Sequence, residues 1–474
     1  MKRWQSIRIR SLLVSFLSLF AFTSAWAQVP DIPPQHVVTY SLDTGRHSGT
    51  GIEMERFSVD VIEVPGAPWL RLHFGDYDLG RNSFISLTSR EDGQQQVLDQ
   101  RTLPQWNNSS AYFNGDAVSM ELHVAPGDQN VFVSLRALTV GEREPGVGIE
   151  SICGSSDDRV AIADFRVGRI SGCTAWLVSN GAVLTAGHCA DYDPDGGGPL
   201  LPDGVLDLAG IFEVNVPASD PDGTPNMALV VDQFPVDTAN VTWRFDGEDQ
   251  GLGKDWAVFG LNPNVNGDRA HILHGFFRMT REAPVLGQIR ITGYGVDDDP
   301  AGTTGGRNAQ NRTEQTDTGL YGGETSDSDP DISHRYRVDT EGANSGSPII
   351  WEDNGWTIGI HTNGGCRVLV GSNSGTSFEV NALEAAIRDW PTTFVGQDTE
   401  YVDNASIPDS PTRDGSVFRP RATVASAVAN VADNGLVVVV EGGYPKAAGN
   451  TFTAGADGKA MTIIAPVGVV IIGE

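Results

Sequence analysis

Apolar and polar residues alternate in short runs between about residue 38 and residue 140. The clearest runs are PWLRLHFGDYDL, SFISLTSR, VSMELHV and NVFVSLRAL, and Gly, Asp and Asn residues separate them. A period of two is typical of half-buried strands, and the separating residues are typical of turns. No amphipathic helix is evident here, so the pattern predicts a β-sandwich over residues 28–142.

After a predicted linker at 141–150, residues 151–395 are again rich in strand-like runs, interrupted by long acidic and glycine-rich insertions. One helix is predicted near the end of this region, in NALEAAIRDW at 381–390, with Asn381 as its N-cap. Its apolar face consists of Leu383, Ala386, Ile387 and Trp390. The chain is therefore expected to be mainly β, with a separate central domain.

The C-terminal part divides into a predicted linker at 396–420, rich in Asp, Ser and Pro, and a β-rich segment at 421–474. The second part contains the runs LVVVVEGGYP and AMTIIAPVGVVIIGE. With the residues before it, the first run resembles the opening coil of a right-handed parallel β-helix, although a solenoid usually has more coils. A cap-like unit, a sorting or attachment signal and the remnant of a longer repeat all remain open.

The N-terminus, MKRWQSIRIRSLLVSFLSLFAFTSAWAQ, has a basic start, an apolar run from Leu12 to Phe22 and the pattern Ala-Trp-Ala before Gln28. This predicts a signal peptide over residues 1–27, cut after Ala27, and export to an extracellular or periplasmic space. A transmembrane anchor is the alternative. However, the apolar run is short for a membrane span, and no later stretch is long enough to be one.

Composition changes this picture in two ways. The 474 residues contain 32 Lys and Arg against 61 Asp and Glu, a net charge of −29. This charge argues against nucleic-acid binding, because phosphate contacts need basic patches. The four cysteines form an even set in a chain predicted to be exported, so we expect two disulfides rather than a zinc site.

The segment GCTAWLVSNGAVLTAGHC at 172–189 predicts a β-hairpin: an apolar strand, a Ser-Asn-Gly turn and a second apolar strand that ends at His188. Cys173 and Cys189 lie at the two ends of this hairpin, so its closure can bring them within disulfide reach. Such a bridge would hold His188 in place. By itself, a histidine after an apolar strand is more often a plain structural residue.

Three short segments together resemble the trypsin/chymotrypsin superfamily of serine proteases. TAGHC matches its histidine segment, KDWAVFGL matches the acid segment through Asp255, and GANSGSP matches the nucleophile segment through Ser345. Asp232 and Asp237 are rivals for the acid, but they lack the Ala-then-apolar continuation. The form Asn-Ser-Gly-Ser-Pro is most similar to the glutamyl endopeptidase branch. The order His, Asp, Ser is that of chymotrypsin, and the resemblance, over roughly half the chain, implies two β-barrels.

The resemblance also implies a role for each residue. His188 would act as the general base for Ser345, and Asp255 would fix its tautomer and stabilise the imidazolium. The amides of Ala343 and Ser345 would form the oxyanion hole, with Ala343 in place of the usual glycine. Asn344 stands where trypsin has an aspartate that pairs with a newly cut N-terminal ammonium, so that activation mechanism is not expected here.

The same resemblance indicates candidates for substrate specificity. His361, in WTIGIHTNGGC, and Thr340 match a histidine and a threonine that receive the P1 carboxylate in glutamyl endopeptidases, so a preference for Glu or Asp at P1 is expected. The alternative is that His361 is a hydrogen-bonded pocket wall in a protease with another preference. Cys153 and Cys366 are the expected second disulfide, similar to a bridge of lysyl endopeptidases.

The acidic segment DYDPDGGGPLLPDGVLDL at 191–208 has two interpretations. Asp191, Asp193 and Asp195, followed by Gly196, are like the first half of a Ca²⁺ loop, which makes the three aspartates candidate ligands of a structural Ca²⁺ ion. The Glu expected at the twelfth position is missing, so the alternative is a solvated acidic insertion. No cofactor is expected to be required.

The sequence therefore predicts an exported serine endopeptidase with a chymotrypsin-like double β-barrel, an N-terminal β-sandwich and a short C-terminal β-helix-like segment. The front module resembles the CUB-like or jelly-roll modules found beside secreted hydrolases. It is either a module that contacts carbohydrate, calcium, a surface or the substrate, or a prodomain. Proteins or peptides are the expected substrates. The alternatives are an esterase that uses the same residues and a catalytically inactive trypsin-fold binding or matrix protein.

Overall fold

The structure is a computed structural model of the chain. It describes residues 26–27, 31–143, 150–170, 172–190, 210–245, 252–298, 306–325, 332–367, 370–390, 397–405, 412–448, 450 and 459–472. Most of the predicted signal peptide, and all of the acidic segment at 191–208, lie outside these residues.

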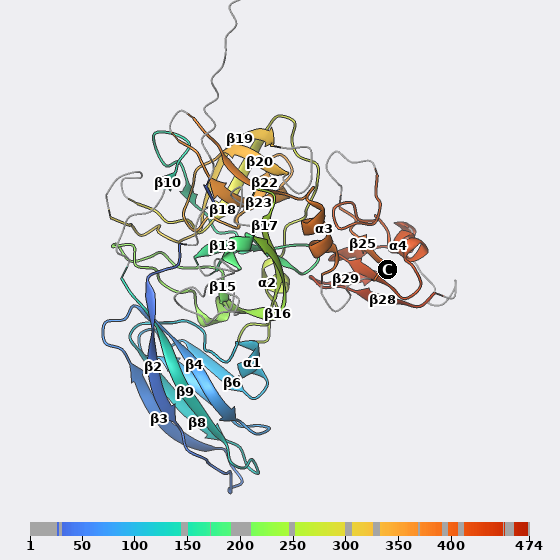
Figure 1. Ribbon diagram of the computed structural model, residues 1–474. Coiled ribbons are helices and arrows are strands. Elements are labelled where there is room, and N and C mark those ends of the chain that lie inside the picture. Colours follow the sequence, from blue (N-terminus) through green and yellow to red (C-terminus); the bar gives the residue numbers. More distant parts are fainter. Residues whose placement is uncertain are drawn as a thin grey trace, which may run out of the picture.

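The front module is a β-sandwich of two four-stranded antiparallel sheets, as the alternating pattern predicted (Figure 1). One sheet contains, in order, β2 (Gln35–Asp43), β9 (Phe132–Gly141), β4 (Trp69–Asp78) and β7 (Phe113–Asn114). The other contains β3 (Glu55–Glu63), β8 (Ala117–Val124), β5 (Phe84–Ser89) and β6 (Gln95–Asp99). A single-turn helix, α1 (Thr102–Gln105), follows β6 and was not predicted, because four residues show no helical period. Alternate side chains such as Leu87 and Met120 are fully buried in the module's core.

The central region contains two closed antiparallel β-barrels (Figure 1). The first has the order β12 (Val167–Ile170), β13 (Cys173–Leu177), β14 (Val183–Thr185), β17 (Asp255–Leu261), β16 (Gln233–Phe245) and β15 (Ile211–Glu213). The second has the order β23 (Trp356–Gly364), β22 (Pro348–Trp351), β18 (Gln288–Gly293), β19 (Gln315–Glu324), β20 (Ser333–Arg337) and β24 (Asn373–Ser377). Pairing of β23 with β24 closes this ring.

Short elements connect the barrels to their surroundings. β10 (Glu150–Ser151) pairs with β21 (Thr340–Glu341), β11 (Val160–Ala161) pairs with β19, and β1 (Trp26–Ala27) pairs with the end of β23. The 3-10 helices η1 (Gly187–Cys189) and η2 (Val230–Asp232) and the helix α2 (Ala270–His274) belong to the first half of the region. No described helix is long and apolar enough to cross a membrane.

The helix α3 (Asn381–Arg388) confirms the helix that the apolar period predicted after the second barrel. Leu383 and Ile387 are fully buried on its apolar face. The predicted N-cap is wrong by one residue, because Val380 is the N-cap and Asn381 is the first helical residue. The helix therefore starts without a side-chain cap, and the burial of its apolar face holds it in place.

The C-terminal segment is built from parallel strands, as in a β-helix. β25 (Thr399–Val402), β26 (Gly435–Val439) and β28 (Met461–Ile464) form one sheet, β27 (Gly442–Tyr444) and β29 (Val470–Ile472) form another, and α4 (Val424–Asn430) and the 3-10 helix η5 (Lys446–Ala448) connect them. β25 lies within the range 396–420 that the composition assigned to a linker. It pairs with β26, and Tyr401 and Val402 pack in buried clusters with other residues distant in sequence, so a local pattern does not reveal it.

Two disulfides brace the central region. Cys173 and Cys189, with Cα atoms 6.2 Å apart, close the hairpin of β13 and β14. Cys153 and Cys366, with Cα atoms 4.7 Å apart, join the start of the central region to the end of β23. Each bridge therefore lies beside a segment that the sequence had singled out for chemistry.

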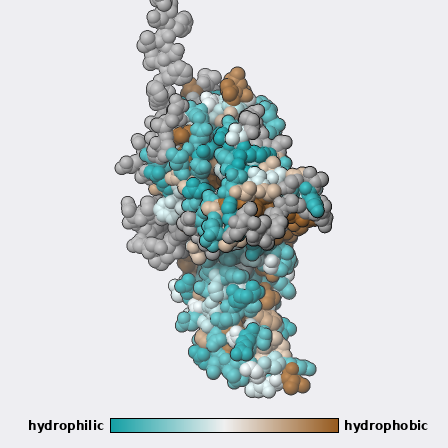
Figure 2. Space-filling model, turned by 90° about the vertical axis from the view of Figure 1, so that its right-hand side faces the viewer, coloured by the Kyte–Doolittle hydropathy of each residue, from teal (hydrophilic) through white to brown (hydrophobic). Residues whose placement is uncertain are grey.

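The front module packs against the first barrel through side-chain amides. Gln233 accepts a hydrogen bond from Tyr112 N (2.8 Å) and donates one to Tyr112 O (3.0 Å). Asn114 in β7 forms a similar pair of hydrogen bonds, at 3.0 and 2.8 Å, with the backbone of Met227, which lies between β15 and β16. Figure 2 shows the module as a narrower extension of the central region, with a largely hydrophilic surface in this view. The module is thus docked by specific hydrogen bonds.

Candidate active site

His188 and Asp255 meet at one end of the first barrel. His188 lies in η1, directly after β14, and Asp255 is the first residue of β17, which pairs with β14. The Nδ1 atom of His188 lies 2.6 Å from Asp255 Oδ2, and the backbone N–H of His188 donates to Asp255 Oδ1 (2.9 Å). One carboxylate therefore fixes both the ring and the backbone of the histidine, with the Nδ1 proton directed at Asp255.

Both side chains are buried, with 0% of Asp255 and 1% of His188 exposed. Gly187 is required at this point, because a Cβ there would collide with Arg244 O on β16. Thr376 in β24 donates to Asp255 O (2.8 Å), which ties the pair to the second barrel. Within the described part of the chain, His188 Nε2 has no hydrogen-bond partner, so this nitrogen is available as a base.

The rival aspartates lie in other environments. Asp232 in η2 accepts a hydrogen bond from Asn215 (3.0 Å), and Asp237 in β16 accepts one from Asn240 (2.6 Å). Among the three candidates, the structure brings Asp255 to the histidine.

Ser345 comes from the second barrel, in the turn between β21 and β22. Its backbone carbonyl accepts a hydrogen bond from Thr174 N–H (2.8 Å) and lies 3.8 Å from Cys189 Sγ. The next residue, Gly346, has φ +91°, and a Cβ there would collide with Thr174 O. The serine turn is therefore packed against the strand and the disulfide that hold His188, at the junction of the two barrels.

Ala343 adopts a backbone conformation that usually belongs to glycine. Its φ is +66°, in the left-handed region, and its carbonyl accepts a hydrogen bond from Thr174 Oγ1 (3.0 Å). An L-residue pays roughly 1 kcal/mol for this conformation. The first barrel thus holds the backbone at Ala343, whose N–H is one of the two predicted oxyanion donors.

Ala343→Gly is expected to keep kcat/KM within about threefold, because glycine adopts a positive φ without strain. Ala343→Val is expected to lower kcat/KM by about 10²-fold, because a β-branched residue disfavours this φ. The backbone would rotate, and the N–H of residue 343 would no longer point at the oxyanion. Steady-state kinetics with a peptide substrate, together with the Tm of each variant, measures both effects. Equal kinetics for the two variants would show that the conformation of residue 343 does not matter for catalysis.

His361 lies fully buried in β23, on the second barrel. The hydroxyl oxygen of Tyr336 in β20 lies 2.6 Å from its Nδ1. Burial, with a smaller contribution from the charge that His188 can carry, lowers the pKa of His361 to about 3. A hydrogen bond with the Ser374 backbone opposes this shift in pKa. The imidazole is therefore neutral at physiological pH, and a ligand would meet a hydrogen-bonding ring rather than a positive charge.

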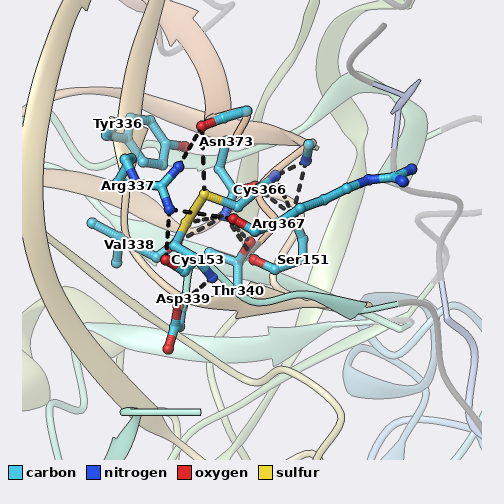
Figure 3. Close-up of a disulfide and its surroundings, with 12 residues drawn as sticks. Ser151, Cys153, Tyr336, Arg337, Val338, Asp339, Thr340, Cys366, Arg367 and Asn373 are labelled. Atoms are coloured by element: carbon cyan, nitrogen blue, oxygen red, sulfur yellow. Dashed lines mark hydrogen bonds between the residues drawn. A yellow bond between two sulfur atoms is a disulfide. The ribbon is translucent and has the colours of Figure 1, made fainter. Parts of the chain in front are cut away.

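Thr340 is also fully buried, beside the second disulfide (Figure 3). Its Oγ1 accepts a hydrogen bond from Asn373 Nδ2 (2.9 Å). The amide oxygen of Asn373 in turn accepts from the backbone N–H of Cys366 (3.0 Å), whose sulfur is bonded to Cys153. The disulfide, Asn373 and Thr340 therefore form one connected support at the end of β23.

A buried arginine lies behind the serine turn. Only 2% of the Arg159 side chain is exposed, and its Nη2 lies 2.5 Å from Asp157 Oδ2 and 3.6 Å from Glu341 Oε2. Burial opposes its charge, but the Asp157 hydrogen bonds and the nearby carboxylates outweigh burial and raise the pKa of Arg159 further above its usual range. A Cβ at Gly295 would collide with both Arg159 and Asn344, so these two side chains are neighbours. Asn344, the residue before Ser345, thus lies beside the buried guanidinium group of Arg159.

The candidate calcium ligands Asp191, Asp193 and Asp195 lie outside the described residues. Within the described residues, Cys173, His188 and Cys189 bring three ligand-type atoms within 4.8 Å of one another. Both sulfurs belong to a disulfide, however, and a metal site needs thiolates. This group therefore does not indicate a metal site.

Comparison with known proteins finds no protein-family model and no curated protein that matches the chain. Similar solved structures include a Glu endopeptidase in complex with MPD, with 19% identity and a TM-score of 0.34, over 50% of this chain and 97% of that one. They also include the protease Anisep from Arthrobacter nicotinovorans, with 14% identity and a TM-score of 0.33, over 46% and 93%. The thermostable serine protease AL20 from an extremophilic microorganism has 16% identity and a TM-score of 0.32, over 45% and 92%.

The predicted fold class is confirmed by the structure itself. Two closed six-stranded antiparallel barrels, which follow one another along the chain, form the chymotrypsin-like double β-barrel. The predicted histidine and aspartate come from the first barrel and the predicted serine from the second. The solved structures similar to this chain are chymotrypsin-fold proteins at low sequence identity.

Sequence reasoning did not find several buried polar residues around the site. Tyr336 supports His361, Arg159 adjoins Asn344, and Arg307 and Arg312 lie near the serine turn. In the sequence, each is an ordinary residue without a motif. The only available signal was the neutral Asn344 itself, which argued against a pairing with an N-terminal ammonium.

Proposed function

We propose that the protein is a serine endopeptidase that uses His188, Asp255 and Ser345. The observation that carries this proposal is the buried His188–Asp255 pair at 2.6 Å, whose Nε2 has no hydrogen-bond partner among the described residues. The Ser345 turn packs against the Cys173–Cys189 disulfide beside this pair. The two disulfides also fit the proposal of an extracellular or periplasmic enzyme. The chemistry requires no cofactor.

In this mechanism, Ser345 Oγ attacks the peptide carbonyl carbon while its proton passes to His188 Nε2. The developing oxyanion is stabilised by the N–H groups of Ala343 and Ser345. The imidazolium gives its proton to the leaving amine as the C–N bond breaks, which leaves an acyl-enzyme. Water then attacks the ester with His188 again as the base, and the acid product and the free serine are released. Asp255 holds the histidine in the tautomer that each step needs.

A fluorophosphonate probe tests the proposal directly. Ser345 is fully buried in the intact chain, so labelling should be followed over hours. We expect slow labelling of the wild-type protein and none of Ser345→Ala. If the native protein remains unlabelled, the hydrolase proposal fails and a non-catalytic trypsin-fold role takes its place. Labelling combined with hydrolysis of esters but not of peptides would indicate an esterase.

For specificity, we propose that His361 and Thr340 receive an acidic P1 side chain. His361→Gln is expected to lower the ratio of kcat/KM for Glu over Gln at P1 by at least tenfold, because hydrogen bonds to charged groups contribute about 1.5–3 kcal/mol. In the wild type, this ratio should stay flat from pH 6 to 8. His361, with a pKa of about 3, and a P1 glutamate, with a pKa of about 4.3, do not titrate in that range.

His334 provides a matched control for His361. It is also fully buried in the second barrel, and its Nδ1 lies 2.8 Å from the hydroxyl of Tyr321. His334→Gln should therefore cost similar stability while it leaves the Glu/Gln ratio unchanged. A digest of a peptide library that shows no cleavage after Glu or Asp would contradict the role given to His361.

A further inference from the structure

The N-terminal strand β1 lies on the end of β23, close to the candidate active site. Trp26 pairs antiparallel with Gly364 and Ala27 pairs with Asn363, two residues beyond His361. Addition of an extended segment to a strand edge is a common way in which proteins bind peptides. The chain's own N-terminal segment is thus attached to the second barrel as a peptide ligand would be.

Asp31 forms a second anchor, between the first barrel and the segment that precedes β19. Its N–H donates to the carbonyl of Gly172, the residue before Cys173 (3.2 Å). Its Oδ1 lies 2.7 Å from Arg312 Nη2, and its Oδ2 lies 3.8 Å from Arg307 Nη2. Arg312 also donates to the Asp31 backbone carbonyl. Both the backbone and the carboxylate of this residue are therefore held.

The two anchors bracket the proposed nucleophile. On one side, a Cβ at Gly342 would lie 2.9 Å from Asp31 Oδ2, and Gly342 is three residues before Ser345. On the other side, the N–H after Ser345 donates to His361 O (2.8 Å), on the strand that β1 joins. Ser345 is 0% exposed. The two described parts of the N-terminal segment therefore lie on either side of the Ser345 turn. Their order along the chain, β1 before Asp31, is that of the acyl and leaving-group sides of a substrate with its acyl side on β23.

The two arginines are buried and are held by contacts besides those with Asp31. The side chains of Arg307 and Arg312 are only 2% and 1% exposed. Arg307 Nη1 lies 2.9 Å from Asp298 Oδ1, and Arg312 has φ +56°, which costs roughly 1 kcal/mol for a residue other than glycine. Such a conformation persists only where the surrounding structure enforces it, and this is characteristic of binding sites. Buried guanidinium groups are also suited to carboxylates.

We propose that Arg307 and Arg312 form a subsite for a carboxylate side chain on the leaving-group side of the scissile bond, and that Asp31 occupies it in the intact chain. This inference rests on the proposed function for its orientation. It implies that the N-terminal segment competes with substrates. Cleavage of the signal peptide after Ala27 would remove β1 but leave Asp31 in its subsite, so that step alone would not open the site.

Peptide binding to a cleavage-incompetent protein tests this proposal. The probe is a fluorescent peptide that copies residues 24–35, SAWAQVPDIPPQ, together with a copy in which Asn replaces its aspartate. We expect Ser345→Ala combined with Asp31→Ala to bind the Asp peptide at least tenfold more tightly than the Asn peptide. Ser345→Ala with Asp31 intact should bind both peptides weakly. Equal affinities for the two peptides in the double variant would overturn the proposal.

Further variants locate the effect and separate it from the proposed function. Arg307→Gln in the double variant should abolish the preference for the Asp peptide. Asp76→Ala removes an exposed carboxylate of the front module. When it replaces Asp31→Ala in the double variant, binding of both peptides should remain weak. Asp31→Ala alone should raise the rate of fluorophosphonate labelling at least tenfold. If peptides are hydrolysed but the Asp preference is absent, the subsite is wrong and the protease stands. If the Asp preference is present without any labelling, the subsite stands and the protease fails.

Discussion

Ser345→Ala is expected to lower kcat for peptide hydrolysis by about 10⁶-fold, because loss of the nucleophile removes the acyl-enzyme pathway altogether. The residual rate should come from substrate binding and from the oxyanion donors, and KM should change little. Active-site titration combined with single-turnover kinetics measures the loss and excludes traces of wild-type enzyme.

Ser347→Ala is the matched control for this variant. Ser347 lies two residues along the same turn, is fully buried, and has an Oγ without a hydrogen-bond partner among the described residues. Its replacement should leave kcat within tenfold of the wild type. A comparable loss in both variants would show that the turn had been disrupted, and Ser345 would no longer be identified as the nucleophile.

Asp255→Asn is expected to lower kcat by about 10⁴-fold while it leaves the fold intact, since the two side chains have the same shape. The carboxylate accepts hydrogen bonds from the Nδ1 and the backbone N–H of His188, whereas an amide can offer its NH₂ group to Nδ1 and so favour the wrong tautomer. The loss should diminish at high pH, where hydroxide can assist the serine. A pH profile of kcat from pH 6 to 10 measures both expectations.

The controls for this second effect are the rival acids. Asp232→Asn and Asp237→Asn make the same substitution at aspartates that do not contact His188, so kcat should stay within threefold of the wild type. A large loss in either variant, with little loss in Asp255→Asn, would transfer the role of the acid to another residue. Thermal unfolding of all three variants shows whether a loss of activity reflects a loss of folded protein.

The sequence was sufficient to predict the double barrel and to single out His188, Asp255 and Ser345, because local segments that resemble one protein family carry both. The TAGHC hairpin, the strand that starts at Asp255 and the small-residue turn at Ser345 each carry their own pattern over fewer than twenty residues. The alternating runs of the front module likewise specify a sandwich without reference to the rest of the chain. The helix α3 was predictable for the same reason, from the apolar period of Leu383 and Ile387.

Other features depend on contacts between distant segments, so their sequences are uninformative. β25 was assigned to a linker because its burial depends on β26 and on other residues distant in sequence. Arg312 resembles any surface arginine until the fold buries it and gives it a left-handed backbone. Asp31 contacts this arginine although the two residues are 281 positions apart in the sequence. Burial and long-range ion pairing, rather than residue type, distinguish these groups.

The arginine beside Asn344 has a consequence for when the Ser345 turn can form. Arg159 and its partner Glu341 belong to the same folded region, and no peptide bond must be cut to create this cation. The turn that presents Ser345 can therefore be set as soon as the barrels close, before any maturation step. Arg159→Met should then lower the rate of fluorophosphonate labelling equally in the full chain and in a chain processed after Ala27. Under the proposed function, regulation would therefore act on the access of substrates to Ser345 and not on the formation of its turn.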